Sequence, residues 1–326
     1  MWLPTTYAAA LGLMLLSMAA WGSWDNTQKL ARWRFELFYW DYMWGIVAAA
    51  VLLGLALGNL HTLAAASGRA LAWAFFGGVV WNLGNLLLVA AISIAGMAVA
   101  FPVGSGLALV IGGVLNYFIE PAGSPVWLFG GIALVCGAIA ADAFAYRALE
   151  RQRGHAGGGG GKGVVLSLIC GVVLGLFYPL VAKAMKGPGA LGPYAVLLVF
   201  VLGALASNFC FNGWMMRHPV NGKPVGWHDY GQGRAGTHAW GVMGGLIWGV
   251  GTMASYVAAS VPLVGPAASF SMAQGNTLIS ALWGVVVWKE FRGGGTAVGR
   301  WLTLMFALFV LGLIAIALAP LRGTRW

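Results

Sequence analysis

The sequence predicts an all-α polytopic membrane protein with ten transmembrane helices arranged as two inverted five-helix repeats. The first observation is composition, because 60% of the 326 residues are apolar and only 8% are charged. A soluble domain cannot bury that much apolar surface. The second is the length of the uncharged segments, and the third is a stretch of the first half that returns in the second half.

Ten apolar segments follow one another along the chain. They cover residues 5–24, 41–59, 71–92, 96–118, 126–148, 164–184, 193–216, 238–260, 262–288 and 299–319. Each is close to the ~20 residues that a helix needs to cross a bilayer. The first segment lacks the basic start and the cleavage site of a signal peptide, so we expect it to remain in the protein.

An internal repeat relates Gly77–Glu120 to Gly245–Glu290. The matched residues are Trp81 with Trp248 and Gly84 with Gly251 at an offset of 167, and Gly96, Ala98, Phe101 and Gly106 with Gly265, Ala267, Phe270 and Gly275 at an offset of 169. Repeats in an apolar chain are typical of transporters, whose site lies where the repeats meet.

Basic residues predict the orientation in a cytoplasmic membrane. The connections after segments 1, 3, 5, 7 and 9 carry thirteen Lys and Arg residues, and the opposite side carries five. Cytoplasmic connections are enriched in these residues, so both termini are expected outside. Five segments per half invert the second half relative to the first, as alternating access requires.

The halves are predicted at residues 1–149 and 164–326, joined by a cytoplasmic linker over 150–163. The linker is basic and Gly-rich, which is typical of a flexible connector. Its Gly run before Lys162 fails as a phosphate-binding loop, because Ala156 replaces the first Gly and Gly163 replaces Ser or Thr. The polar stretch 217–237 is expected to be a second connector.

Several function classes are excluded by composition. Only eight acidic residues are present, most at segment ends, and no nucleophile motif or carboxylate pair occurs, so an enzyme is not expected. Cys136, Cys170 and Cys210 lie in apolar segments without metal-ligand spacing. We therefore expect no metal and no cofactor. The net charge of +10 lies in connections, where it orients the protein and predicts no nucleic-acid partner.

Polar and aromatic side chains within the segments are the candidate substrate-binding residues. They are Trp24, Asn26, Asn82, Asn85, Ser105, Tyr178, Trp248, Gln274 and Asn276. Intramembrane polar groups are costly unless they are paired or face a cavity. Matched positions in the two repeats, such as Ser105 and Gln274, favour a site.

Alternatives stay open for several of these residues. Trp24 could stack on a flat ring or a sugar, with Asn26 bonding to it, or belong to an interfacial aromatic belt. Asn82 and Asn85 share a helix face and could line a cavity or bond between helices. Asp142 is expected to pair with Arg147.

Asp41 is the candidate for proton coupling. It begins segment 2 and is flanked by Tyr39, Trp40 and Tyr42. A carboxylate in such surroundings suits a proton carrier. The alternative is an Asp near a helix N-terminus, where the helix dipole stabilises its negative charge.

Four stretches resemble the ureide permeases, a branch of the drug/metabolite transporter superfamily close to bacterial glucose/ribose and rhamnose porters. They are GGVVWNLGNL at Gly77–Leu86, VIGGVLNYF at Val110–Phe118, YWDY at Tyr39–Tyr42 and the run Gln274–Arg292. The resemblance implies ten helices in two inverted repeats and proton-linked uptake of allantoin, uracil and related heterocycles. The porter relatives imply monosaccharides instead.

The sequence thus predicts a secondary transporter of a small neutral polar solute, with the lipid bilayer and, through the resemblance, protons as its other partners. A monosaccharide transporter and a drug or metabolite exporter are the alternatives within transport. A membrane receptor or structural protein without transport is the alternative outside it.

Overall fold

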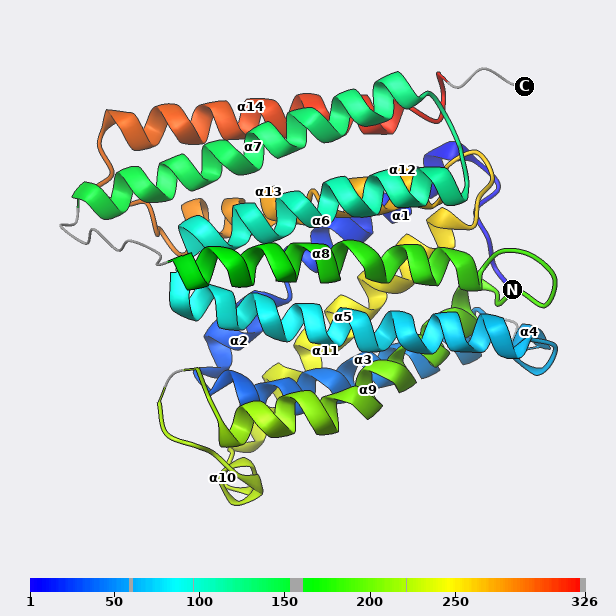
Figure 1. Ribbon diagram of the computed structural model, residues 1–326, viewed down its shortest axis with the longest axis horizontal. Helices are drawn as coiled ribbons and strands as arrows, with labels where there is room; N and C mark the ends of the chain where they lie inside the picture. The colour runs from blue at the N-terminus through cyan, green and yellow to red at the C-terminus, as the bar shows by residue number, and fades with distance from the viewer. Residues whose placement is uncertain (59–60, 96, 153–160, 221, 323–326) are drawn as a thin grey trace.

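The computed structural model describes residues 1–58, 61–95, 97–152, 161–220 and 222–322, and throughout these ranges the regular secondary structure is helical (Figure 1). Among the described residues, nine helices are long and apolar enough to cross a membrane, and Val103–Ile119 is a shorter apolar helix. The predicted class, an all-helical polytopic membrane protein, is confirmed.

Within the described residues, the nine long apolar helices and the helix that holds Val103–Ile119 form ten passes. They are α1 (Tyr7–Trp21) with α2 (Asp25–Ala31), α3 (Phe35–Ala56), α5 (Gly68–Ala95), α6 (Met97–Ile119), α7 (Pro125–Gln152), α8 (Gly161–Ala184), α9 (Pro193–Arg217), α11 (Ala235–Ala259), α12 (Gly265–Ala273) with α13 (Asn276–Leu282) and η1 (Trp283–Val287), and α14 (Thr296–Leu318). The short helices α4 (His61–Ala64) and α10 (Trp227–Gly231) lie in connections.

The passes run back and forth between two ends of the bundle. At the end that we call the terminal end, α1 begins and α14 ends, at the right of Figure 1. Ser124 at the start of α7 donates its N–H to the carbonyl of Ala319 there. At the other end, which we call the α10 end, the N–H of Gly295 before α14 bonds to Gln152 at the end of α7.

The largest helix interfaces join the two halves of the sequence. They pair α3 with α11, α5 with α8 and α9, α6 with α8, and α7 with α14. One large apolar cluster holds Tyr39 and Trp81 together with Phe200 and Tyr256. Each half therefore depends on the other for its core.

Glycines allow the closest of these interfaces. A Cβ on Gly245 of α11 would lie 2.0 Å from the carbonyl oxygen of Tyr42 on α3, and one on Gly78 of α5 would lie 1.9 Å from that of Phe200 on α9. Small residues permit such approach in lipid, where burial alone does not drive helix association.

Two passes are interrupted: the ninth within its predicted range 262–288, and the first near its predicted end at residue 24, beyond which it continues to Ala31. The first pass stops at Trp21 and resumes at Asp25, and the ninth stops at Ala273 and resumes at Asn276. Glycine, a poor helix former, lies in each interruption as Gly22 and Gly275. Asp25 in the first turn of α2 favours the new helix start through its charge.

The two interruptions pack against each other. A Cβ on Gly22 would lie 2.4 Å from the carbonyl oxygen of Asn276, and Ser280 Oγ donates to the Gly22 carbonyl at 3.1 Å. Trp283 Nε1 donates to Ser23 Oγ at 2.9 Å. Side chains thus bond to backbone and hydroxyl groups where the helical hydrogen bonds stop, as non-helical backbone inside a membrane requires.

Some predicted boundaries differ from the structure. The second pass begins at Phe35 instead of residue 41, so Asp41 lies in the second turn of α3 and away from its N-terminus. The expected linker 150–163 is helical at both ends, because α7 extends to Gln152 and α8 begins at Gly161. Its middle, 153–160, lies outside the described residues.

We expect Gly245→Ala to destabilise the protein, because the added methyl group meets the Tyr42 backbone and pushes α3 and α11 apart. Overpacking of this kind costs about 1–3 kcal/mol. The measurement is the apparent unfolding temperature of detergent-purified protein followed by size-exclusion chromatography.

The matched control is Gly130→Ala on α7, where a Cβ meets nothing within 4 Å. Its unfolding temperature should equal or slightly exceed that of the wild type, because Ala is the better helix former. Equal temperatures for the two variants would show that the α3–α11 contact tolerates a larger separation.

Candidate functional site

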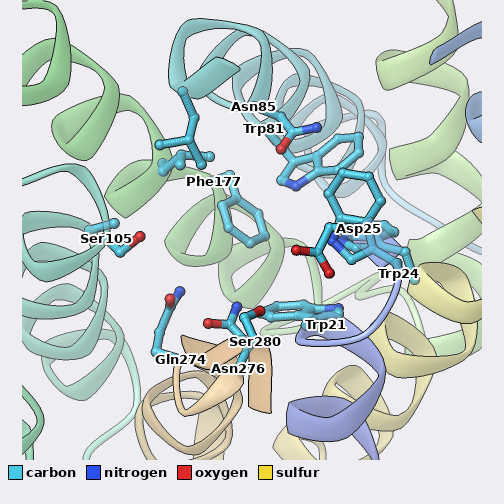
Figure 2. Close-up of a pocket in the computed structure, with 14 residues that line it drawn as sticks. Trp21, Trp24, Asp25, Trp81, Asn85, Ser105, Phe177, Gln274, Asn276 and Ser280 are labelled. Atoms are coloured by element: carbon cyan, nitrogen blue, oxygen red, sulfur yellow. The ribbon is translucent and has the colours of Figure 1, made fainter. Parts of the chain in front are cut away.

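A cavity of about 130 Å³ lies where the two interruptions meet (Figure 2). Side chains from six passes line it: Trp21, Trp24 and Asp25 from the first, Trp81, Asn85 and Leu88 from α5, Ser105 and Ala108 from α6, Leu174 and Phe177 from α8, Trp248 from α11, and Gln274, Asn276 and Ser280 from the ninth. The lining comes from both halves of the sequence.

Four tryptophans and Phe177 form the aromatic part of the wall. The rings of Trp21 and Trp248 are stacked, with centroids 5.9 Å apart and planes 6° apart, and Trp81 lies 4.3 Å from Trp248. Trp24 packs on Tyr42 at 4.5 Å. Trp21 Nε1 donates to Thr252 Oγ1 at 3.0 Å, which fixes that ring. The cavity therefore offers rigid, flat apolar surfaces.

Carboxamides and hydroxyls form the polar part of the wall. Figure 2 shows Ser105 and Gln274 on one side and Asn276 and Ser280 beside Trp21. Within the described part of the chain, the side chains of Ser105 and Gln274 make no hydrogen bond. These groups supply both donors and acceptors to a bound molecule.

Asp25 is the one carboxylate of the described cavity lining, and Figure 2 shows its oxygens directed into the space between Phe177 and Trp21. Its Oδ1 is buried without a hydrogen-bond partner among the described residues. In the same part of the chain, no group of His, Cys, Asp and Glu side chains is arranged to hold a metal ion.

An aromatic layer separates the cavity from the terminal end. It consists of Tyr178, Phe200, Tyr256 and Phe270, all 0% exposed. The ring of Tyr178 lies 5.0 Å from that of Phe270 and 5.5 Å from that of Tyr256. Its hydroxyl bonds with Ser255, 2.8 Å from Oγ and 3.2 Å from the carbonyl oxygen.

An ion pair lies between the cavity and the α10 end. Lys29 Nζ is 2.6 Å from Glu290 Oε1, and Tyr146 donates its hydroxyl to Glu290 Oε2 at 3.0 Å. These contacts join α2 and α7 to the segment after η1. On this side of the cavity an ion pair joins the passes, whereas a packed aromatic layer lies toward the terminal end.

A family model described as "Sugar transport protein" matches residues 13–319. The chain belongs to this family. Among similar proteins, Ureide permease 1 of Arabidopsis thaliana is 22% identical over 97% of each chain. A probable glucose uptake protein, GlcU, of Bacillus cereus is 29% identical over 65% of this chain and 67% of its own. The protein is thus a membrane transporter of small polar solutes and not an enzyme.

A solved structure described as "Crystal structure of protein" has the same fold. It aligns with a TM-score of 0.58 over 94% of this chain and 96% of its own, at 16% sequence identity. The resemblance to ureide permeases and sugar porters inferred from sequence motifs is confirmed by the family model and the relatives.

Nine residues were predicted from the sequence to bind substrate, and six of them line the cavity. They are Trp24, Asn85, Ser105, Trp248, Gln274 and Asn276. Asn26 lies outside, because its Oδ1 accepts from Trp288 Nε1 at 2.5 Å and its Nδ2 donates to the Ser23 carbonyl. Tyr178 also lies outside, within the aromatic layer.

Asn82 supports the cavity wall without reaching the cavity. It is fully buried, its Oδ1 accepts from Tyr39 at 2.9 Å, and its Nδ2 donates to Ser207 Oγ at 2.9 Å. Asn85 Nδ2 donates to the same Tyr39 hydroxyl at 3.0 Å. Both alternatives raised by the sequence therefore occur, since Asn82 bonds between helices and Asn85 faces the cavity.

Asp41 lies near the α10 end and does not line the cavity. Its carboxylate accepts from the Tyr230 hydroxyl at 2.6 Å and pairs with His238 Nδ1 at 2.8 Å. Burial and the bond to Asp41 raise the pKa of Tyr230, so this phenol stays a donor at neutral pH. The stretch 217–237, expected as a plain connector, thus includes a short helix bound to α3.

Sequence reasoning missed eight lining residues, of which the polar or aromatic ones are Trp21, Asp25, Trp81, Phe177 and Ser280. Trp81 could have been found, because the repeat pairs it with Trp248. Asp25 follows Trp24 directly, but its position depends on the interruption at Gly22, which the apolar run does not reveal.

We expect Asn82→Ala to lower stability by about 1–2 kcal/mol, because it removes two buried hydrogen bonds and leaves Ser207 without a side-chain partner. Asn85→Ala should cost less than half as much, because Tyr39 can still donate to Asn82. Apparent unfolding temperatures measured side by side in one detergent test this order. A larger loss for Asn85→Ala would contradict the supporting role of Asn82.

Proposed function

We propose that this transporter is a secondary active permease that moves a small neutral heterocycle, such as a ureide or a nucleobase, through the cavity. The observation that carries the proposal is the combination of stacked tryptophans with carboxamides and hydroxyls around one space. A flat ring stacks on indole faces. Its alternating N–H and C=O groups match side chains that donate and accept.

The relatives support this solute class and leave one alternative class of solute. Ureide permease 1 matches nearly the whole chain, whereas the glucose uptake protein matches about two thirds of it. A monosaccharide also stacks on tryptophan and bonds to amides. The alternative solute is therefore a sugar, and comparing the binding of heterocycles with that of sugars distinguishes the two classes. The glucose uptake protein is named for uptake, which favours import over export of drugs or metabolites.

Transport by alternating access follows from the two closures. The proposed halves, residues 1–149 and 164–326, act as inverted repeats around the cavity. Opening the aromatic layer exposes the cavity at the terminal end, and separating Lys29 from Glu290 exposes it at the α10 end. The cavity residues stay between the two closures throughout the cycle.

The proposed orientation places the α10 end in the cytoplasm and both termini outside a bacterial-type inner membrane. Lys29, Arg34, Arg217 and Arg292 lie at the α10 end, in keeping with the excess of basic residues in cytoplasmic connections.

We expect allantoin, uracil or a purine to stabilise the detergent-purified protein against heat, and glucose, ribose and rhamnose to leave it unchanged. A ligand at one hundred times its Kd adds about 2.7 kcal/mol to the free energy of unfolding, which is measurable as a thermal shift. Stabilisation by sugars alone would move the transporter to the monosaccharide class.

The matched variant for this screen is Gln274→Ala. It should remove the thermal shift and the uptake of the same compound into proteoliposomes, while membrane expression stays at the wild-type level. Retention of both would exclude Gln274 from the site. The control Gln232→Ala changes an amide in the α10 connection and should keep the shift.

Reporter fusions test the orientation. Alkaline phosphatase, which is active only outside the cytoplasm, should be active when fused after Leu318 and inactive when fused within the α9–α11 connection. Green fluorescent protein at the same two positions should give the reverse pattern. Phosphatase activity in the α9–α11 connection would invert the proposed topology.

A further inference from the structure

A second, smaller cavity lies between the central cavity and the α10 end. Its volume is about 40 Å³, and it is lined by Asp25, Lys29, Asp142, Tyr146, Thr277, Ser280, Ala281 and Glu290. Asp25 and Ser280 line both cavities. This side cavity, as we call it, therefore leads from the solute space to the Lys29–Glu290 pair.

Asp142 is the unexplained group of the side cavity. It is only 6% exposed, and its Oδ1 has no hydrogen-bond partner among the described residues. The expected pairing with Arg147 is wrong in the described structure, where the three ion pairs are those of Lys29, Arg34 and His238. A buried carboxylate without a partner is costly in a membrane segment and marks an ion or proton pathway.

The outer edge of the side cavity is in contact with solvent. The side chains of Lys29 and Glu290 are 40% and 28% exposed. Tyr146 bonds to Glu290 from α7, the helix that carries Asp142. Three carboxylates thus line the side cavity, of which Glu290 lies at its exposed edge and Asp25 also lines the solute space, with Asp142 as the third.

The titratable groups around Asp25 come from several elements: Lys29 on α2, Tyr42 on α3, Asp142 and Tyr146 on α7, and Glu290 after η1. On α11, which also packs on α2, His238 is bound to Asp41 instead. Lys29 is the one cation that lines the side cavity in the described part of the chain, and Glu290 holds it.

The side cavity has room for water. One water molecule needs about 10–15 Å³ of such space and two to four polar partners. The cavity is larger than this, and its carboxylates and hydroxyls provide the partners. Water can therefore bridge the carboxylates and pass a proton between them.

We propose that Asp25 and Asp142 bind the proton that drives transport and that the side cavity connects them to solution at the α10 end. The proposal deepens the proposed function and rests on it. A proton moves between solution and Asp25 through Glu290, Asp142 and bridging water, each transfer protonating one carboxyl group and deprotonating another. Protonated Asp25 donates its O–H to a carbonyl or hydroxyl oxygen of the solute, so solute and proton travel together.

Asp41, the candidate from the sequence, lacks this geometry. Both of its carboxylate oxygens are occupied by Tyr230 and His238, and it lines neither cavity. Its substitution therefore serves as the comparison that separates the two candidate proton sites.

The transport test uses proteoliposomes and labelled uracil, allantoin and glucose as probes. Wild type and the exposed-site control Asp229→Asn should concentrate a probe when a pH gradient is imposed. Asp25→Asn should lose at least tenfold of this accumulation and lose less of the exchange of labelled for unlabelled probe, because exchange needs no net proton movement and the amide can still donate an N–H to the solute. Asp142→Asn should slow accumulation and spare exchange.

The proposal would be overturned if Asp25→Asn accumulated the probe at the wild-type level. It would also be overturned if Asp41→Asn were the one variant that lost accumulation. Asp25→Glu provides a second variant that keeps a titratable group. It should restore accumulation with a displaced pH profile, which a merely structural role would not produce.

A measurement without solute separates this proposal from the proposed function. Infrared difference spectra of purified protein between acidic and alkaline pH record protonated carboxyl groups directly. Asp25→Asn and Asp142→Asn should each remove part of the carboxyl band, and the Asp41→Asn spectrum should retain that part. If none of the probes is transported, the proposed solutes fail while the spectra still decide the proton site. Unchanged bands in both variants would overturn it.

Discussion

The contact between the two interrupted passes is the constraint on which the site depends. Gly22 lies so close to Asn276 that a single methyl group would collide with its carbonyl oxygen, and Ser280 bonds back to the Gly22 carbonyl. Non-helical backbone in a membrane is stable only where its polar groups find partners. Because the interruptions supply partners to each other, each can turn its neighbouring side chains, Trp24 and Asp25 on one side and Gln274 on the other, toward a common space.

The surrounding bundle keeps this contact in place through close packing between sequence halves. Glycines at the α3–α11 and α5–α9 interfaces bring backbones together, and the aromatic layer fills the volume toward the terminal end. On the side toward the α10 end, the side cavity and the polar contact of Lys29 with Glu290 lie next to the central cavity. This asymmetry places the aqueous approach to the carboxylates on one side of the cavity.

Much of the fold could be predicted from the sequence, because the length and polarity of the segments fix the number of membrane passes. Ser105, Trp248 and Gln274 could be predicted as cavity residues because polar and aromatic groups recur at matched positions of the repeat. Asn26 and Tyr178 could not be placed, because their partners, Trp288 and Ser255, are distant in sequence. Asp25 and Asp142 were missed for a related reason: local sequence does not show which carboxylates lack partners in the packed structure.

The tryptophan wall has a practical consequence. Of the 17 tryptophans in the chain, Trp21, Trp24, Trp81 and Trp248 line the cavity. The stacked rings of Trp21 and Trp248 are close enough to exchange excitation energy, so a molecule entering beside one of them alters the emission of both. The transporter therefore contains its own optical reporter of occupancy, and replacing a single indole by phenylalanine isolates its contribution from the thirteen tryptophans elsewhere.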